Sequence, residues 1–171
     1  MELVDFNYHA KENLALIYPK GAFLTAGHGE FANTMTIGWG NIGINWSKKV
    51  FIAMVTHSRY THQLLEEYQE FTVTFPYEDM KRELMLVGTK SGRDVNKYDL
   101  ANLKLSDGQA IATPHISCEG MTYECQIIFQ SEVTQEKLNP LIYEKRYATD
   151  QDFHTIYFGE IVATYLTAKG E

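Results

Sequence analysis

The sequence lacks several features that mark common classes of protein. Acidic residues outnumber basic ones by 22 to 15, giving a formal net charge of −7. This argues against nucleic-acid binding, because the phosphate backbone requires a basic surface. No apolar run approaches the length of a membrane span, and the N-terminus lacks the basic and apolar regions of a signal peptide. We therefore expect no nucleic-acid partner, no membrane association and a cytoplasmic location.

Cysteine is also scarce. The two cysteines, Cys118 and Cys125, form no CxxC pair, and their odd spacing would place them on opposite faces of one strand. We expect both to be reduced thiols, as is usual in the cytoplasm. A zinc site could be drawn from His115 and the two cysteines, but the spacing matches no standard motif, so we predict no metal site. P-loop and GxGxxG motifs are absent as well.

What the sequence does contain is the composition of one folded domain, which we place over residues 1–171. Its length and its 44% content of hydrophobic residues allow a sizeable core and argue against disorder. Tight turns separate most strand patterns and there is no βαβ rhythm, which favours a mainly β antiparallel barrel with two or three short helices. Strand patterns cover residues 14–18, 22–26, 33–46, 50–56, 71–75, 118–133 and 154–166, and helix patterns begin after Ser58, at Asp79 and at Asn139–Pro140.

The stretch from Thr56 to His62 is the first candidate for a ligand site. An apolar strand leads into it and a helical pattern leads out of it, so we predict a strand-to-helix turn. The first N–H groups of a helix lack partners and lie at the positive end of the helix dipole, so such a turn can bind phosphate. Ser58, Arg59 and Thr61 would add two hydroxyls and a guanidinium. The alternative is that Ser58 only caps the helix and Arg59 is solvated.

Residues 91–97 form a second candidate. Gly92 would let the backbone approach an anion, and two cations, Arg93 and Lys97, lie nearby. In an acidic protein this concentration favours an anionic ligand, although the segment also fits a solvated surface loop.

The segment Asn33–Gly40 is a third candidate. Polar and apolar residues alternate along it, and two glycines flank Trp39 at its end. A flat heteroaromatic ligand could lie along such a backbone. A bent barrel strand with Met35 and Ile37 in the core explains the same pattern, so this segment alone does not decide.

Together these segments resemble the flavin reductase-like family of FMN-binding split barrels, in particular its flavoredoxin-like branch. The resemblance covers about residues 14–166, with the segments in the same order. The motifs that carry it are Asn33-Thr34-Met35-Thr36-Ile37-Gly38-Trp39, Ser58-Arg59-Tyr60-Thr61, Ser91-Gly92-Arg93-Asp94 with Lys97, and His154-Thr155-Ile156-Tyr157-Phe158-Gly159-Glu160-Ile161.

The resemblance implies a Greek-key split barrel that forms a homodimer and holds one FMN per subunit near the dimer interface. It implies that the strand at 33–36 runs along the isoalloxazine ring, that the turn at 58–61 takes ribityl and phosphate, and that the 91–97 loop covers the phosphate. It implies that His154 and Tyr157 approach either the flavin or the dimer partner, and that Trp39 and Trp46 are candidates for the surroundings of the ring. The implied cofactor-binding residues are Asn33, Thr34, Met35, Thr36, Trp39, Ser58, Arg59, Tyr60, Thr61, Ser91, Gly92, Arg93, Lys97 and His154.

Three functions remain compatible with the sequence. The first is an FMN-dependent oxidoreductase that takes electrons from NADH, NADPH or a redox protein. The second is a non-enzymatic FMN electron carrier, which the lack of a nicotinamide motif keeps open. The third is a binding module for another phosphorylated or planar ligand. Because the flavin itself would carry out the electron transfer, we assign no catalytic side chain.

Overall fold

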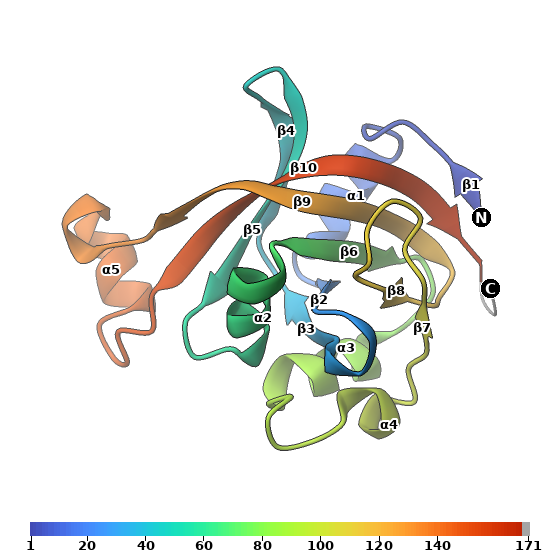
Figure 1. The fold of residues 1–171 in the computed structure, drawn as a ribbon. Helices are drawn as coiled ribbons and strands as arrows, with labels where there is room; N and C mark the ends of the chain where they lie inside the picture. Colours follow the sequence, from blue (N-terminus) through green and yellow to red (C-terminus); the bar gives the residue numbers. More distant parts are fainter. Residues whose placement is uncertain (169–171) are drawn as a thin grey trace.

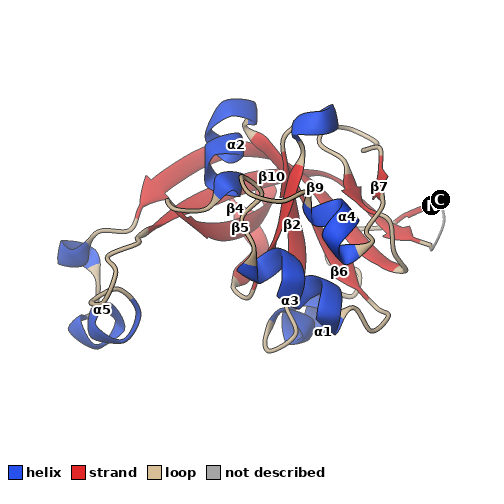
Figure 2. Ribbon diagram, turned by 90° about the horizontal axis from the view of Figure 1, so that it is seen from below, coloured by secondary structure: helices blue, strands red, loops and turns tan. Residues whose placement is uncertain are grey.

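The computed structural model describes residues 1–168 and is built around one large antiparallel sheet (Figures 1 and 2). Its strands are β1 (Glu2–Leu3), β2 (Ala22–Ala26), β3 (Asn33–Ile37), β4 (Gly40–Asn45), β5 (Lys48–Thr56), β6 (Glu70–Pro76), β9 (Gly120–Glu132) and β10 (His154–Thr167). The order across the sheet is β3-β2-β6-β9-β10-β5-β4, and β1 pairs with β10. Two short strands, β7 (Leu105–Ser106) and β8 (His115–Ile116), form a separate pair.

The sheet must roll up because its two edge strands follow each other in the sequence. Strand β3 ends at Ile37 and β4 begins at Gly40, although they lie at opposite ends of the sheet order. The edges of a flat sheet of seven strands would be about 29 Å apart, whereas three peptide links reach about 11 Å. The edges therefore approach each other, which confirms the expected mainly β barrel and breaks the single 33–46 strand into two.

The barrel interior is aromatic and closely packed. Phe71, Val73 and Phe75 of β6 are fully buried, as the alternation of this strand predicts. The ring of Phe51 lies 6.2 Å from that of Phe75 and 5.8 Å from that of Tyr123, measured between centroids. A second buried cluster packs outside the barrel beneath two helices; it comprises Phe23, Leu84, Val87, Ala101, Leu103, Ile116 and Cys118.

The structure has five α-helices in residues 1–168, more than the two or three expected. They are α1 (Ala10–Ile17), α2 (Tyr60–Tyr68), α3 (Lys81–Thr89), α4 (Lys97–Ala101) and α5 (Pro140–Arg146). Within these residues, none of the helices is long and apolar enough to cross a membrane. The sequence pattern missed α4 because it has only five residues, too few to show a helical period.

Helix α1 contradicts the strand expected at residues 14–18. Asn13 and Ile17, one helical turn apart, are both buried. The Asn13 amide donates to the Sδ of Met121 at 3.1 Å and to the hydroxyl of Tyr123 at 3.2 Å. These tertiary contacts fix a helical face, and the apolar run Leu14–Ile17 alone could not distinguish a helix from a strand.

The boundaries of α3 also differ from the expectation. The helix begins at Lys81, two residues after the expected start at Asp79, and ends at Thr89, one residue past Gly88. Its N-cap is Met80, which supplies no side-chain cap, and the Asp79 carboxylate instead accepts from the backbone N of Lys81 at 3.3 Å. The helix continues past Gly88 because two side chains hold its last turn: Arg59 donates to the carbonyl of Gly88, and Lys97 donates to the carbonyl of Val87.

Strands β9 and β10 extend beyond the barrel as a long arm that carries α5 at its tip (Figure 1). The predicted start of α5 is confirmed: Pro140 occupies the first turn, and the Asn139 side chain accepts from the backbone N of Leu141 at 2.9 Å. Leu141 in the first turn of this helix is 75% exposed, whereas Tyr147 after its end is buried. The arm therefore presents apolar side chains to solvent.

Candidate functional site

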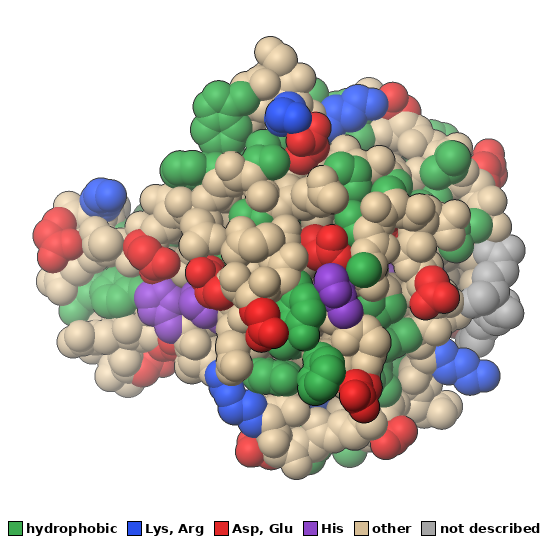
Figure 3. All heavy atoms as spheres, in the orientation of Figure 1, with side chains coloured by type: hydrophobic (Ala, Val, Ile, Leu, Met, Phe, Trp, Pro, Cys, Tyr) green, Lys and Arg blue, Asp and Glu red, His purple; other side chains and the backbone are tan. Residues whose placement is uncertain are grey.

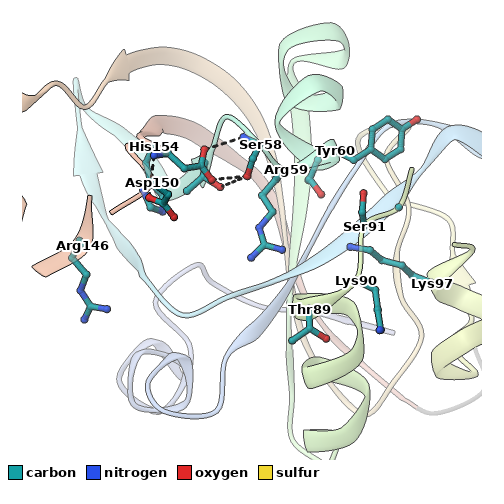
Figure 4. A pocket seen from close by; sticks show the side chains of 14 residues that line it. Ser58, Arg59, Tyr60, Thr89, Lys90, Ser91, Lys97, Arg146, Asp150 and His154 are labelled. Carbon is teal, nitrogen blue, oxygen red and sulfur yellow. Dashed lines mark hydrogen bonds between the residues drawn. The ribbon is translucent and has the colours of Figure 1, made fainter. Parts of the chain in front are cut away.

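The central hollow, cavity 1, lies between the start of α2 and the end of α3. Its volume is about 480 Å³. Figure 4 shows Arg59 pointing into its middle, with Ser91 and Lys97 on one side and His154 on the other. The lining residues are Thr56, Ser58, Arg59, Tyr60, Thr61, Thr89, Lys90, Ser91, Gly92, Lys97, Arg146, Asp150, Asp152 and His154. The structure thus brings eight of the fourteen predicted site residues together.

The turn before α2 leaves the start of this helix open to a ligand. Arg59 is the N-cap, and no side chain within residues 1–168 caps the helix. Ser58 is not a cap, contrary to the alternative interpretation. Its backbone N and its hydroxyl both donate to Asp152, at 3.0 and 2.5 Å. The N–H groups of the first turn therefore face the hollow without a side-chain acceptor, as an anion site requires.

Asp152 is the acidic group bound to Ser58 of this turn. Partial burial works against its ionisation, but the hydrogen bonds from Ser58 outweigh this and keep the pKa of Asp152 below its usual value. The ionised carboxylate occupies donors of Ser58 that a phosphate could otherwise use. Ser58 is consequently a weaker candidate for phosphate contact than Arg59 and the helix N–H groups.

The last turn of α3 forms the opposite wall, and two cations neutralise it. Arg59 donates through Nη1 to the carbonyl of Gly88 at 2.8 Å, and the Lys97 amine donates to the carbonyl of Val87 at 2.9 Å. These bonds satisfy the negative end of the helix dipole, which would otherwise repel an anion. They also explain why the helix continues through Gly88.

Both cations keep donors for a ligand. The Lys97 amine makes a second hydrogen bond, to the carbonyl of Thr34 at 2.9 Å, so two of its three N–H groups are engaged. Burial, followed by the nearby charge of Arg59, lowers the pKa of Lys97 to about 8. Arg59 has five N–H donors and its side chain lies at the centre of the hollow (Figure 4).

The charge of cavity 1 contrasts with that of the whole protein. Four basic residues line it, Arg59, Lys90, Lys97 and Arg146, against two acidic ones, although the net charge of the chain is −7. Figure 3 shows acidic and histidine side chains across the middle of the face that carries α2, with basic ones nearer its margins. A local excess of positive charge on an acidic protein marks a site for an anionic ligand.

The side chains of β3 brace this site rather than lining it. Asn33 donates to the hydroxyl of Thr61 at 2.8 Å, and Thr36 donates to the carbonyl of Leu84 in α3 at 2.6 Å. Met35 lies in the barrel core. Thr34, Met35 and Thr36 line none of the cavities described here, so their contact with a flavin ring stays a prediction. Their observed role is to hold α2, α3 and Lys97 in place.

A second hollow, cavity 2, adjoins cavity 1 and has a volume of about 330 Å³. Arg93 lines this cavity and not cavity 1. It donates to the carbonyl of Ser58 at 2.9 Å and lies 5.3 Å above the ring of Tyr60. Gly92 separates the two hollows, and a Cβ there would stand 2.1 Å from Oδ1 of Asn33. Only glycine lets the loop pack this closely against the strand.

A third hollow, which we call cavity 4, begins on the other side of cavity 1. Its volume is about 590 Å³. Arg146 lines both, and its guanidinium lies 5.2 Å above the ring of Trp39. The Trp39 ring lies 5.3 Å from that of His154. Apart from two basic residues, cavity 4 is lined by apolar and aromatic side chains: Trp39, Met54, Val133, Leu138, Leu141, Ile142, Tyr147 and Ile156.

His154 lies where cavities 1 and 4 meet. Its Nδ1 is 2.9 Å from the hydroxyl of Tyr147, which fixes the plane of the imidazole. Burial lowers the pKa of His154 below its ordinary value. The ring is therefore neutral at neutral pH and offers a hydrogen bond rather than a charge.

Sequence reasoning missed several residues of the site. Lys90 had a usable signal, because it stands beside the Ser91 motif in a basic loop. Arg146 and Asp152 had none, since they reach the cavity only through the folding back of the arm. The two cysteines that we considered as zinc ligands, Cys118 and Cys125, are buried thiols in different core clusters.

Comparison with known proteins agrees with this geometry. The sequence model of the flavin reductase like domain matches residues 18–171. The chain belongs to the flavin reductase-like family. An uncharacterised protein of Archaeoglobus fulgidus is 28% identical over 149 residues, which is 87% of this chain and 73% of that protein.

Solved structures give the same fold. Flavoredoxin from Methanosarcina acetivorans is 26% identical with a TM-score of 0.65, over 88% of this chain and 70% of that one. Flavoredoxin of Desulfovibrio vulgaris is 20% identical with a TM-score of 0.66, over 87% and 70%. The split-barrel fold and the family predicted from sequence are both confirmed.

Proposed function

We propose that this protein is an FMN-binding oxidoreductase of the flavoredoxin type. The observation that carries the proposal is cavity 1, a cationic hollow at an uncapped helix start in an acidic protein of a flavin-binding redox family. A phosphate there would be bound by the N–H groups of α2, by Arg59, by the hydroxyl of Thr61 or Ser91, and by Lys97.

The separation of polar from apolar groups around the site favours one orientation of a bound flavin mononucleotide. Cavity 1 supplies the polar and cationic groups for phosphate and ribityl, whereas the apolar wall begins at Trp39 and His154. In this arrangement the isoalloxazine ring extends toward that side, where His154 offers a neutral hydrogen-bonding group. A bound flavin accepts a hydride or electrons and passes them on. The residues of this chain bind it, orient it and leave a face accessible.

The electron donor is NADH, NADPH or a redox protein in this proposal. The test is to purify the protein, record flavin absorbance, load FMN if needed, and titrate with each nucleotide without oxygen. Bleaching of the flavin by NADH or NADPH supports the oxidoreductase. A yellow protein that neither nucleotide bleaches favours the alternative, an FMN electron carrier. A protein that takes up no FMN contradicts both.

We further propose that the protein is a homodimer in which a second copy covers the arm. Leu141 and Ile142 of α5 are 75% and 50% exposed, and they border the apolar cavity 4. On the same arm, Phe129 is 45% exposed and packs against Trp46. Exposed apolar side chains gathered in this way are typical of an interface between subunits.

A further inference from the structure

Lys97 carries a buried amine that faces a cationic hollow. The residue is only 4% exposed, and it belongs to the lining of cavity 1. Figure 4 shows the amine directed into that hollow, on the side where Arg59 lies. Two N–H groups of the amine donate to the carbonyls of Thr34 and Val87, both at 2.9 Å. One tetrahedral position of the nitrogen therefore remains for contact with a ligand.

This remaining position supports two kinds of chemistry, depending on the protonation of the amine. In the ammonium form it holds a third N–H, which donates to a phosphate. Burial and the charge of Arg59 lower the pKa of Lys97 to about 8, so the neutral amine is well populated just above neutral pH. With both carbonyl bonds kept, the neutral form holds its lone pair in the same position. A desolvated lysine beside another cation is a typical lysine nucleophile.

We propose that Lys97 is an acylation site for small acyl phosphates, and that its acylation prevents tight flavin binding. In an acyl phosphate, one oxygen joins a carbonyl carbon to phosphorus. This inference rests on the proposed function, because the phosphate of the reagent would occupy the same anion site, at the start of α2 beside Arg59. Binding there holds the carbonyl carbon within the hollow that the amine faces, which favours reaction through proximity.

The transfer is an acyl substitution with phosphate as the leaving group. The lone pair of the Lys97 amine forms a bond to the carbonyl carbon, and the bond from that carbon to the phosphate oxygen breaks. The amine proton passes to the departing phosphate, so the products are an amide on Lys97 and hydrogen phosphate. Arg59 and the N–H groups of α2 stabilise the negative charge that develops on the leaving group.

Acylation would remove one of the charges that hold a flavin phosphate. An amide of Lys97 is neutral and keeps one N–H, so it no longer provides a charge-assisted hydrogen bond. A bound FMN would in turn occupy the position that the reagent needs. Acyl phosphates and FMN therefore compete for cavity 1, and the covalent product maintains the flavin-free state.

The experiment treats flavin-free protein with acetyl phosphate at pH 8 and follows the acetylation of each lysine by mass spectrometry of its peptides. Lys90, an exposed lysine of the same cavity, is the internal control. Acetylation of Lys97 is expected to be at least about tenfold faster than that of Lys90, to saturate with acetyl phosphate and to stop when FMN is bound. Protein acetylated at Lys97 should bind FMN about tenfold or more weakly.

A reagent without phosphate tests whether the anion site directs the reaction. The N-hydroxysuccinimide ester of acetic acid should modify Lys90 before Lys97, because Lys97 is buried. Faster reaction at Lys97 with this ester as well, or equal rates at the two lysines with acetyl phosphate, overturns the proposal. Unchanged FMN affinity after acetylation of Lys97 also overturns it.

The remaining outcomes separate this inference from the proposed function. A Lys97 that stays unmodified in acetyl phosphate, in a protein that binds FMN, overturns the acylation site and leaves the proposed function intact. A protein that takes up no FMN but is acetylated selectively at Lys97 overturns the proposed function and the competition with flavin, whereas the acylation site itself is supported.

Discussion

Cavities 1 and 4 are neighbours with opposite chemistry. Four basic residues and several hydroxyls line cavity 1, whereas cavity 4 is mainly aliphatic and aromatic, and Arg146 lines both. Cavity 1 is formed largely by the ends of two helices and a loop on the barrel, whereas cavity 4 depends on the arm that carries α5. In our proposal the polar hollow binds the phosphate, whereas the apolar hollow, which the exposed Leu141 and Ile142 border, is covered by the flavin ring or by a second subunit.

This difference leads to separate expectations for the two ends of a flavin. Changes in cavity 1 should affect ligands that carry a phosphate, whereas changes in cavity 4 should affect every flavin, phosphorylated or not. Substitutions in and around the two cavities test that division, and we take them in order of decreasing effect.

Arg59→Ala should have the largest effect. Removal of a charge-assisted hydrogen bond to phosphate is expected to weaken FMN binding by about 1.5–3 kcal/mol. Because Arg59 also binds the carbonyl of Gly88, thermal unfolding of the variant must be measured alongside the flavin titration. Arg82→Ala, a change of an arginine outside cavity 1, is the control. Unchanged FMN affinity in a folded Arg59→Ala protein would remove Arg59 from the site.

The pH dependence of FMN binding should follow Lys97. Its pKa is lowered to about 8, so the amine of the free protein loses its charge as pH rises above that value. A bound phosphate favours the charged form and raises the pKa again. Affinity should therefore be near its maximum at about pH 7, where the amine is charged and the phosphate is ionised, and fall above pH 8 by up to about tenfold per pH unit.

The variant Lys97→Met tests that assignment. It should bind FMN more weakly at pH 7 and show little further loss up to pH 9. Lys90→Met, which changes another lysine of the same cavity, should retain the pH-dependent loss. If Lys97→Met shows the same loss above pH 8 as wild type, another group controls the pH dependence.

Trp39→Ala should have a moderate effect that does not depend on phosphate. Loss of an aromatic surface beside the ring is expected to weaken FMN and riboflavin equally, by about 1 kcal/mol. Tyr18→Ala is the control, because it removes an aromatic side chain that is 76% exposed and lines neither cavity 1 nor cavity 4. A loss for FMN alone would place the ring elsewhere and Trp39 near the phosphate.

Leu141→Asp should have the smallest effect on the isolated subunit. The side chain is 75% exposed, so the free energy of unfolding of the monomer should change by less than about 0.5 kcal/mol. Sedimentation velocity should nevertheless show a shift from dimer to monomer, because a charge would enter the proposed interface. A wild-type protein that sediments as a monomer contradicts the homodimer directly.

The same contrast explains what the sequence could and could not predict. The turn at Ser58–Thr61 and the loop at Ser91–Lys97 were recognisable because their donors are neighbours in sequence, and the structure places them around one hollow. The strand at Asn33–Thr36 was located correctly, but its bracing of Thr61, Lys97 and α3 depends on tertiary hydrogen bonds. No periodicity encodes such bonds.

Features that depend on long-range packing were missed. Helix α1 is fixed by bonds from Asn13 to Met121 and Tyr123, more than a hundred residues away. The contribution of Arg146 and Asp152 to cavity 1 depends on how the arm folds back. Local propensity cannot reveal contacts of this kind.

The affinity of the flavin-free protein for FMN, compared with its affinity for riboflavin at pH 7, tests, without any substitution in the chain, whether cavity 1 binds the phosphate. The two ligands differ only in the phosphate that cavity 1 is proposed to bind. We predict that FMN binds at least about a hundredfold more tightly, the equivalent of one or two charge-assisted hydrogen bonds. Equal affinities would contradict the assignment of cavity 1 as the phosphate site.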